Sequence, residues 1–397
     1  MGHDGGGRYN TGIATALQNA LPETLSASVE APRKRKSAQD YMPALTGLRF
    51  WLAVWVILHH ISNQGMMLAA WSNSLPAPLS KLMHSGYLAV QTFFVLSGFV
   101  LARTYAQTRW NGQSLGRFFT ARFARIYPVY LASLIVVSPF IIESMEKATW
   151  SPARRETVLA DYLLVLQGWA PSLNVGWNTP AWSLTCEFFF YLCFPLLFMA
   201  LRNVRWGGVA PALALAVVLP MTLDRMGASW TWQPLFHLGD FIAGIAAARI
   251  YTMLAEKRRW RRRGYWLYLP AMAVGLWLIA YPDTVKPTGL DVGTYLRVLN
   301  VVMLIGLALS GGWLAKALGG PASDFLGKAS YSMYVLHVPI LWWTGRYFVH
   351  GPMHPPLIVG AGIYLLLVIG ASAVVYRRLE APASVWIRNR QKRWAAV

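Results

Sequence analysis

The sequence predicts an all-α membrane protein, a bundle of about ten transmembrane helices with both termini in the cytoplasm. Of its 397 residues, 55% are hydrophobic and only 13% are charged, whereas soluble domains carry about 25% charged residues. Apolar runs close to twenty residues long recur along the chain, and each is long enough to cross a bilayer. The net charge of +20 comes from Lys and Arg at the ends of these runs, so we attribute it to orientation in a lipid bilayer and not to nucleic-acid binding.

Helical stretches of membrane length account for most of the chain. The sixth candidate is the weakest because His237 and Asp240 interrupt it, although these two residues lie one helical turn apart and could bond each other. The stretch 158–169 is too short to span and is expected to lie at the interface or to re-enter. The candidate spans are 45–62, 84–103, 125–143, 181–201, 208–223, 232–250, 265–281, 294–314, 331–349 and 357–376.

The distribution of basic residues supports this count. With the N-terminus in the cytoplasm and alternating spans, the cytoplasmic side collects most Lys and Arg, as the positive-inside rule requires. We therefore predict a disordered basic cytoplasmic tail at 1–40, a transmembrane domain at 41–378 and a second basic cytoplasmic tail at 379–397. Only eight of the 36 basic residues fall on the predicted outer side of the membrane: Lys81, Lys147, Arg154, Arg155, Arg225, Lys286, Arg297 and Arg346.

Arg49 and His60 are the most informative residues, because both lie inside the first apolar span. Eleven helical residues make about three turns, so the two side chains face the same way, about 16 Å apart along the axis. Titratable groups are costly at membrane depth and are functional candidates by default. The pair favours a site that grips an anion near one membrane face and moves a proton deeper in. Alternatively, Arg49 extends to the lipid headgroups, and His60 is a packing residue without a catalytic role.

Two further arginines precede the third span. Arg122 and Arg125 are three residues apart and therefore neighbours on a helix. Each guanidinium can bond two phosphate oxygens, so with Arg49 on the same predicted side we favour a phosphate clamp over ordinary flanking charge. In the fourth span, Glu187 lies in an apolar run without a basic neighbour. It must pair, protonate or face water, and a structural ion pair remains an equal alternative.

Other polar residues of the spans are expected to be structural. Ser97 suits close helix packing better than direct catalysis, and His337 has no local partner on its own helix. Cys186 and Cys193 are seven residues apart on one helix, about 10 Å, which is too far for a disulfide. We expect no metal site and no bound cofactor.

Taken together, five motifs in this order resemble the integral-membrane acyltransferase-3 family of bacterial enzymes that O-acylate carbohydrates and some natural products. The resemblance implies that His60 is the essential histidine and that Arg49, Arg122 and Arg125 are functional arginines. Two positions depart from the family pattern: Thr46 stands where an acidic residue is common, and Phe188 follows Glu187 where a second carboxylate often occurs. The motifs are Leu45–Arg49 with His60, Phe93–Phe99, Arg122–Pro128, Trp182–Glu187 and Tyr331–His337.

From this resemblance we expect a multi-pass acyltransferase of the bacterial inner (plasma) membrane. The expected co-substrate is a cytoplasmic acyl-CoA, in the first place acetyl-CoA, whose phosphates the arginines hold. His60 would act as general base on a hydroxyl of a cell-surface or lipid-linked carbohydrate, with Glu187 orienting or balancing it. A natural-product hydroxyl is the alternative acceptor.

Two other functional classes remain open. One is a transporter of an anionic or lipid-linked solute, although we find no internal repeat. The other is a basic membrane scaffold, which would leave the intramembrane His and Glu unexplained. The sequence indicates no oligomeric state.

Overall fold

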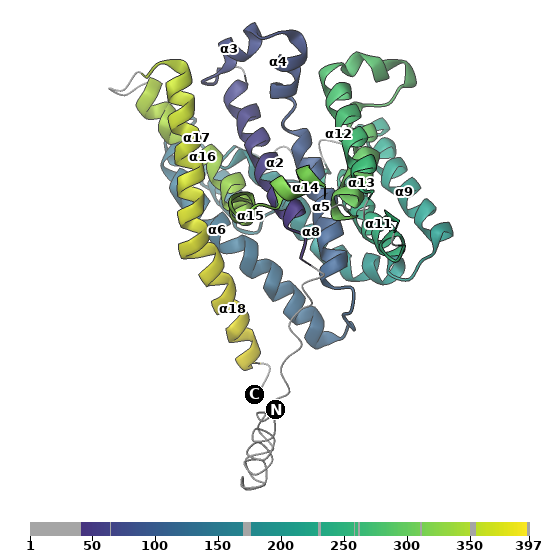
Figure 1. Cartoon of the computed structure of the whole chain (residues 1–397). Helices are drawn as coiled ribbons and strands as arrows, with labels where there is room; N and C mark the ends of the chain where they lie inside the picture. Colours follow the sequence, from purple (N-terminus) through teal and green to yellow (C-terminus); the bar gives the residue numbers. More distant parts are fainter. Residues whose placement is uncertain are drawn as a thin grey trace, which may run out of the picture. The chain divides into compact units, whose positions relative to one another are not determined.

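Every regular element in the described part of the chain is a helix, which confirms the all-α prediction (Figure 1). The computed structural model describes residues 41–63, 65–169, 176–228, 232–257, 259–260, 263–309, 312–349 and 355–394. The tail predicted at 1–40 lies outside these ranges. Residues 42–397 form one compact unit of the chain.

The longer helices belong to the predicted spans. They are α2 (Pro43–Ser62), α5 (Leu88–Thr104), α6 (Gly112–Lys147), α8 (Trp182–Leu201), α9 (Trp206–Arg225), α11 (Leu238–Ala255), α12 (Tyr265–Ala280), α13 (Val292–Leu309), α16 (Ser330–Val349) and α17 (Leu357–Val375).

Shorter helices and one long extension connect or continue them. These are α3 (Ala69–Ser74), α4 (Ala77–His84), α7 (Pro152–Leu163), η4 (Thr179–Ala181), α10 (Gln233–Phe236), η6 (Pro282–Thr288), α14 (Trp313–Leu318), α15 (Pro321–Lys328), the π-helical turn η7 (Tyr376–Glu380) and α18 (Ala381–Trp394).

The protein is a multi-pass membrane protein by the length and composition of its helices. Among the described residues, seven helices are long and apolar enough to cross a membrane, or nine if each of two bent helix pairs counts as one span. The predicted span at 331–349 forms α16, a 20-residue helix that is not among these. The count of ten and the cytoplasmic placement of both termini stay predictions.

Helix α6 is much longer than the span predicted within it. It begins after Asn111, whose side-chain oxygen accepts from the Ser114 amide at 2.8 Å while the Ser114 hydroxyl accepts from the Asn111 amide at 2.8 Å. This reciprocal cap satisfies two of the amides that a helix start leaves unpaired. The 36 residues of α6 extend about 54 Å, well beyond a bilayer core. Its first turns, which precede Arg122 and Arg125, therefore extend one end of the bundle.

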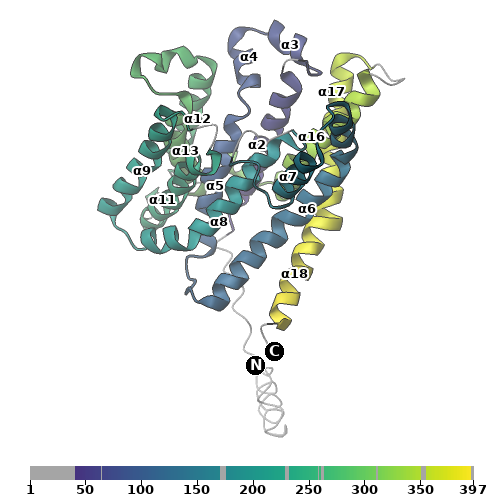
Figure 2. The same ribbon diagram turned by 180° about the vertical axis from the view of Figure 1, so that it is seen from behind.

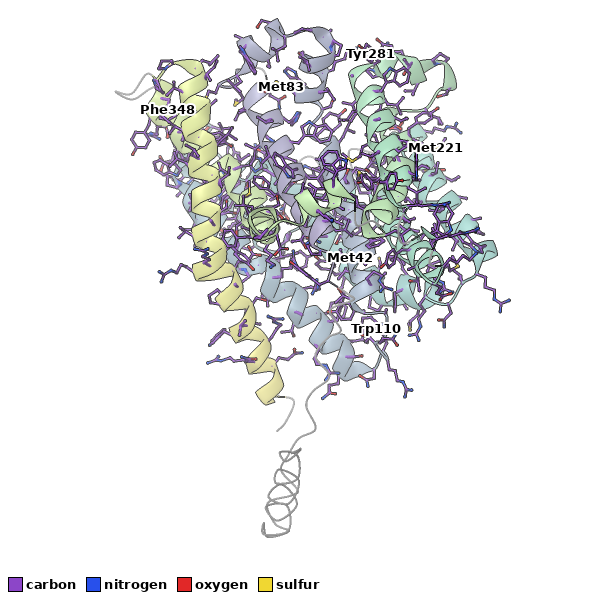
Figure 3. All side chains as sticks on the ribbon, in the orientation of Figure 1. Met42, Met83, Trp110, Met221, Tyr281 and Phe348 are labelled. Carbon is purple, nitrogen blue, oxygen red and sulfur yellow. The ribbon has the colours of Figure 1, made fainter. Side chains whose placement is uncertain are left out.

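Helix α18 accompanies α6 along this extension (Figures 1 and 2). It continues α17 through the π-helical turn η7, so the chain from 379 to 394 is helical. The two ends of the bundle can be followed in Figure 3, where Trp110, just before α6, lies opposite Met83 on α4 and Tyr281 after α12.

Helices α5 and α11 pack closely against each other. A Cβ added at Gly98 would lie 2.2 Å from the Phe241 carbonyl oxygen, and one at Gly244 would lie 2.0 Å from the Val95 carbonyl oxygen. Only glycine at both positions allows the two backbones to approach this closely, as is typical of helix pairs in membranes. The crossing holds Ser97 and its neighbours on α5 against the centre of the bundle.

Candidate functional site

A small cavity in the centre of the bundle brings together three of the five predicted site residues. Arg49 reaches it from α2, Arg125 from α6 and Glu187 from α8, so three spans far apart in sequence converge on it. Its volume is about 70 Å³, and polar and aromatic side chains share its walls. The other lining residues are Val90, Phe93, Phe94, Ser97, Ser183, Leu184, Ser330, Tyr331 and Tyr334.

Both arginines in the cavity are open to a ligand. No described residue forms an ion pair with Arg49 or Arg125 within 4.0 Å, and none accepts a hydrogen bond from either guanidinium. Glu187 is nevertheless close enough for its charge to act on both. Because a cation held among apolar helices needs polar partners, two half-buried guanidiniums without them favour an anionic occupant.

Arg122 occupies a different environment from its neighbour one turn along α6. It is not among the residues that line the cavity, and its Nε is buried without a hydrogen-bond partner among the described residues. Its guanidinium carbon lies 6.0 Å from the ring centroid of Tyr105 and 5.9 Å from those of Phe118 and Tyr191. These rings stabilise the cation through their faces. The structure thus places only Arg125 of the predicted pair at the cavity.

Glu187 faces Ser97 across the cavity. The Ser97 hydroxyl donates to Oε1 of Glu187 at 3.4 Å, a long hydrogen bond between α5 and α8. The Glu187 carboxylate is half-buried, so it faces the space that Arg49 and Arg125 also face. The cavity therefore combines one acidic group with two basic ones and favours net negative charge in a ligand.

His60 lies in the last turn of α2, at the far end of that helix from Arg49. Its side chain is half-buried and is not among those that line the cavity. A second histidine, His337 on α16, lies directly beside it. Nε2 of His337 is 3.4 Å from Nδ1 of His60, and the ring centroids are 4.8 Å apart.

Helix α16 connects this histidine pair to the cavity. Tyr331 and Tyr334 line the cavity, and His337 follows Tyr334 by one helical turn on the same side. His337 is fully buried, and its Nδ1 lies 2.6 Å from the Tyr334 carbonyl oxygen. Sequence reasoning considered only partners on the same helix and so missed this contact, which crosses from α16 to α2.

Glu380 is the other residue that sequence reasoning missed, because the predicted boundary at 378 assigns it to a basic tail. In the structure it is 6% exposed, in the π-helical turn η7, and accepts a hydrogen bond from the Ser332 hydroxyl at 2.6 Å. Its carboxylate interacts electrostatically with Arg125 and, more weakly, with Arg49. The signal in the sequence is a single acidic residue within a strongly basic segment. In the structure, this residue lies in a π-helical turn, a feature that is frequent at functional sites.

The two residues that depart from the family pattern, Thr46 and Phe188, make local hydrogen-bonding and packing contacts. The Thr46 hydroxyl donates to the Met42 carbonyl oxygen of its own helix at 3.5 Å, and Phe188 packs against the apolar core. Glu380, near the C-terminal end of the chain, supplies a second carboxylate near the arginines, a group that position 188 does not provide.

A second buried polar cluster lies between α5, α11 and α13. Asp240 accepts from the His237 Nδ1 at 2.9 Å, which confirms that these two residues bond each other. It also accepts from Arg297 Nε at 2.6 Å and from Gln91 Nε2 at 2.9 Å. The Asp240 carboxylate is thereby paired and fully hydrogen-bonded, so the cluster serves to hold three spans in register.

Comparison with known proteins gives one family and several relatives. The model of the acyltransferase-3 family, described as an acyltransferase domain, matches residues 42–377. The chain is 29% identical over 333 residues to the acyltransferase MdmB of Streptomyces mycarofaciens, covering 77% of this chain and 80% of that protein. It is 24% identical over 367 residues to the O-acetyltransferase OatA of Staphylococcus aureus, covering 86% of this chain. The chain spans only 57% of the length of OatA. No solved structure matches it.

Proposed function

The chain belongs to the acyltransferase-3 family, and from this premise we propose that it is a membrane O-acyltransferase, in the first place an O-acetyltransferase. The donor is an acyl-CoA from the cytoplasm, and the acceptor is a hydroxyl of a cell-surface or lipid-linked carbohydrate. Two relatives carry acyltransferase and O-acetyltransferase names, which supports the transfer of acyl groups to oxygen. We place the reaction in the bacterial inner membrane.

The observation that carries the proposal is the pair of unpaired guanidiniums in the central cavity. Arg49 and Arg125 have no ion-pair partner among the described residues, so phosphate groups of the donor would supply the missing acceptors. Arg122, stacked on aromatic rings one turn away, adds positive charge along the approach. Glu187 partly offsets the positive charge of the two arginines in the cavity.

The arginines and the proposed base lie at different places in the bundle. Arg49 and Arg125 line the cavity, whereas His60 does not. The pantetheine arm of the donor would then run between helices, with the phosphates at the arginines and the thioester toward the histidine pair.

His60 acts as the general base in this proposal. Its imidazole accepts the proton of the acceptor hydroxyl while the hydroxyl oxygen attacks the thioester carbonyl carbon. The C–S bond breaks, and the thiolate of coenzyme A leaves and takes up a proton. The products are an ester of the acceptor and the free thiol.

Release of free thiol tests the proposal. The purified protein, given acetyl-CoA and a hydroxyl acceptor, is expected to release coenzyme A thiol in proportion to ester formed. His60→Ala is expected to lower this rate at least about 100-fold, the usual contribution of a general base, while remaining folded and inserted. His59→Ala is the matched control, because His59 is the adjacent histidine and its Nδ1 contacts the His84 carbonyl oxygen at 2.6 Å.

Two outcomes would overturn the proposal. Full acyl transfer by His60→Ala would remove His60 from the mechanism. Binding of the acceptor without any thiol release would identify a transporter or a binding protein instead.

A further inference from the structure

The hydrogen-bond partners of His337 determine which of its nitrogens carries a proton. Its Nδ1 lies 2.6 Å from the Tyr334 carbonyl oxygen. A carbonyl oxygen only accepts hydrogen bonds, so this nitrogen must be the donor. A neutral imidazole has one N–H, which leaves a lone pair on Nε2. His337 is fully buried and forms no ion pair with a described carboxylate, so the neutral ring is the form that the structure accommodates.

The same rule applies to His60. Its Nδ1 lies 2.9 Å from the Val56 carbonyl oxygen and therefore donates. The lone pair on Nε2 of His337 lies 3.4 Å from the same nitrogen and is a second acceptor for the same hydrogen. With its proton on Nδ1, His60 carries its own lone pair on Nε2, the nitrogen that can accept a proton from a substrate.

His337 is the only described side chain that accepts a hydrogen bond from the His60 ring. The other groups packed around the pair are the His59 ring, 5.2 Å from that of His60, and the Tyr334 ring, 5.8 Å from that of His337. The Tyr364 hydroxyl donates to the backbone oxygen of His337 at 3.0 Å and does not contact its ring. A neutral acceptor replaces the carboxylate that more often orients a catalytic histidine.

We propose that His337 is the positioning residue of the reaction: together with the Val56 carbonyl oxygen, it holds the His60 ring so that its Nε2 accepts the hydroxyl proton. The inference rests on the proposed function and adds to it. When His60 takes up the proton at Nε2, its Nδ1–H becomes a stronger donor, and the lone pair of His337 stabilises the imidazolium. Helix α16 carries both His337 and the cavity-lining Tyr334, so it sets the histidine pair and the cavity in one geometry.

Three substitutions test the role of His337. His337→Gln keeps an acceptor in reach of His60, His337→Leu removes it, and Tyr364→Phe is the control that removes a hydrogen bond to the His337 backbone but leaves the ring. His337→Leu is expected to lower kcat about 10- to 100-fold, as loss of an orienting partner typically does, with the KM for acetyl-CoA within about twofold. His337→Gln is expected to recover most of kcat, and Tyr364→Phe to stay close to wild type.

Thermal unfolding in detergent accompanies each measurement, and His337→Phe, which also lacks a nitrogen, oxygen or sulfur acceptor, replaces the Leu variant if that variant does not fold. Equal kcat values for the Leu and Gln variants, or a change confined to KM, would overturn the inference. Failure of the proposed function has a different signature: His60→Ala would then retain full thiol release, whatever His337 does.

Discussion

The crossing of α5 and α11 gives the sharpest test of the fold. At Gly98, an added Cβ would lie 2.2 Å from the Phe241 carbonyl oxygen, whereas ordinary van der Waals contact begins at 3.4 Å. The clash is with backbone, which cannot rotate away as a flexible side chain can. The Gly98→Ala substitution must therefore push the two helices apart by about 1 Å, and overpacking of this kind costs about 1–3 kcal/mol.

Thermal unfolding in detergent, followed by tryptophan fluorescence, measures this cost. Gly98→Ala and Gly244→Ala are each expected to lower the unfolding temperature clearly. The double variant should lose less than the sum of the two, because one separation of the helices relieves both clashes. Gly362→Ala on α17 is the matched control, since an added Cβ there meets nothing within 4 Å. Equal stability of Gly98→Ala and Gly362→Ala would refute the close approach of the helices.

Two further predictions concern buried charge. Asp240→Asn should lower the free energy of unfolding by about 3–5 kcal/mol, because it leaves Arg297 buried without its counter-ion. The control Asp283→Asn, which breaks an exposed pair with Lys286, should leave the free energy of unfolding unchanged. Similar losses of stability in both variants would contradict this account. Arg125→Gln should raise the KM for acetyl-CoA about 10- to 100-fold through lost charged hydrogen bonds, with partial recovery in Arg125→Lys. Arg122→Gln should raise the KM less, since Arg122 does not line the cavity, and steady-state kinetics with equal values for the two Gln variants would count against this geometry.

Local patterns in the sequence predict much of this architecture. Apolar runs of membrane length predict the helices, because every backbone group in lipid must be paired within its own segment. Helical periodicity places Arg49 and His60 on one helix, and it pairs His237 with Asp240 one turn away. Each of these inferences depends on residues close together in the chain, where geometry follows from the helix alone.

Contacts between helices could be identified only from the tertiary structure. His337 meets His60 across 277 residues of chain, and Glu380 reaches the arginines from beyond the predicted domain boundary. Arg122 and Arg125 share a helix, yet only Arg125 lines the cavity, because that depends on how α6 is rotated against α8. The sequence by itself determined which polar side chains lie within apolar helices. Tertiary structure alone decided which of them meet, because side-chain packing sets the rotation and crossing of each helix.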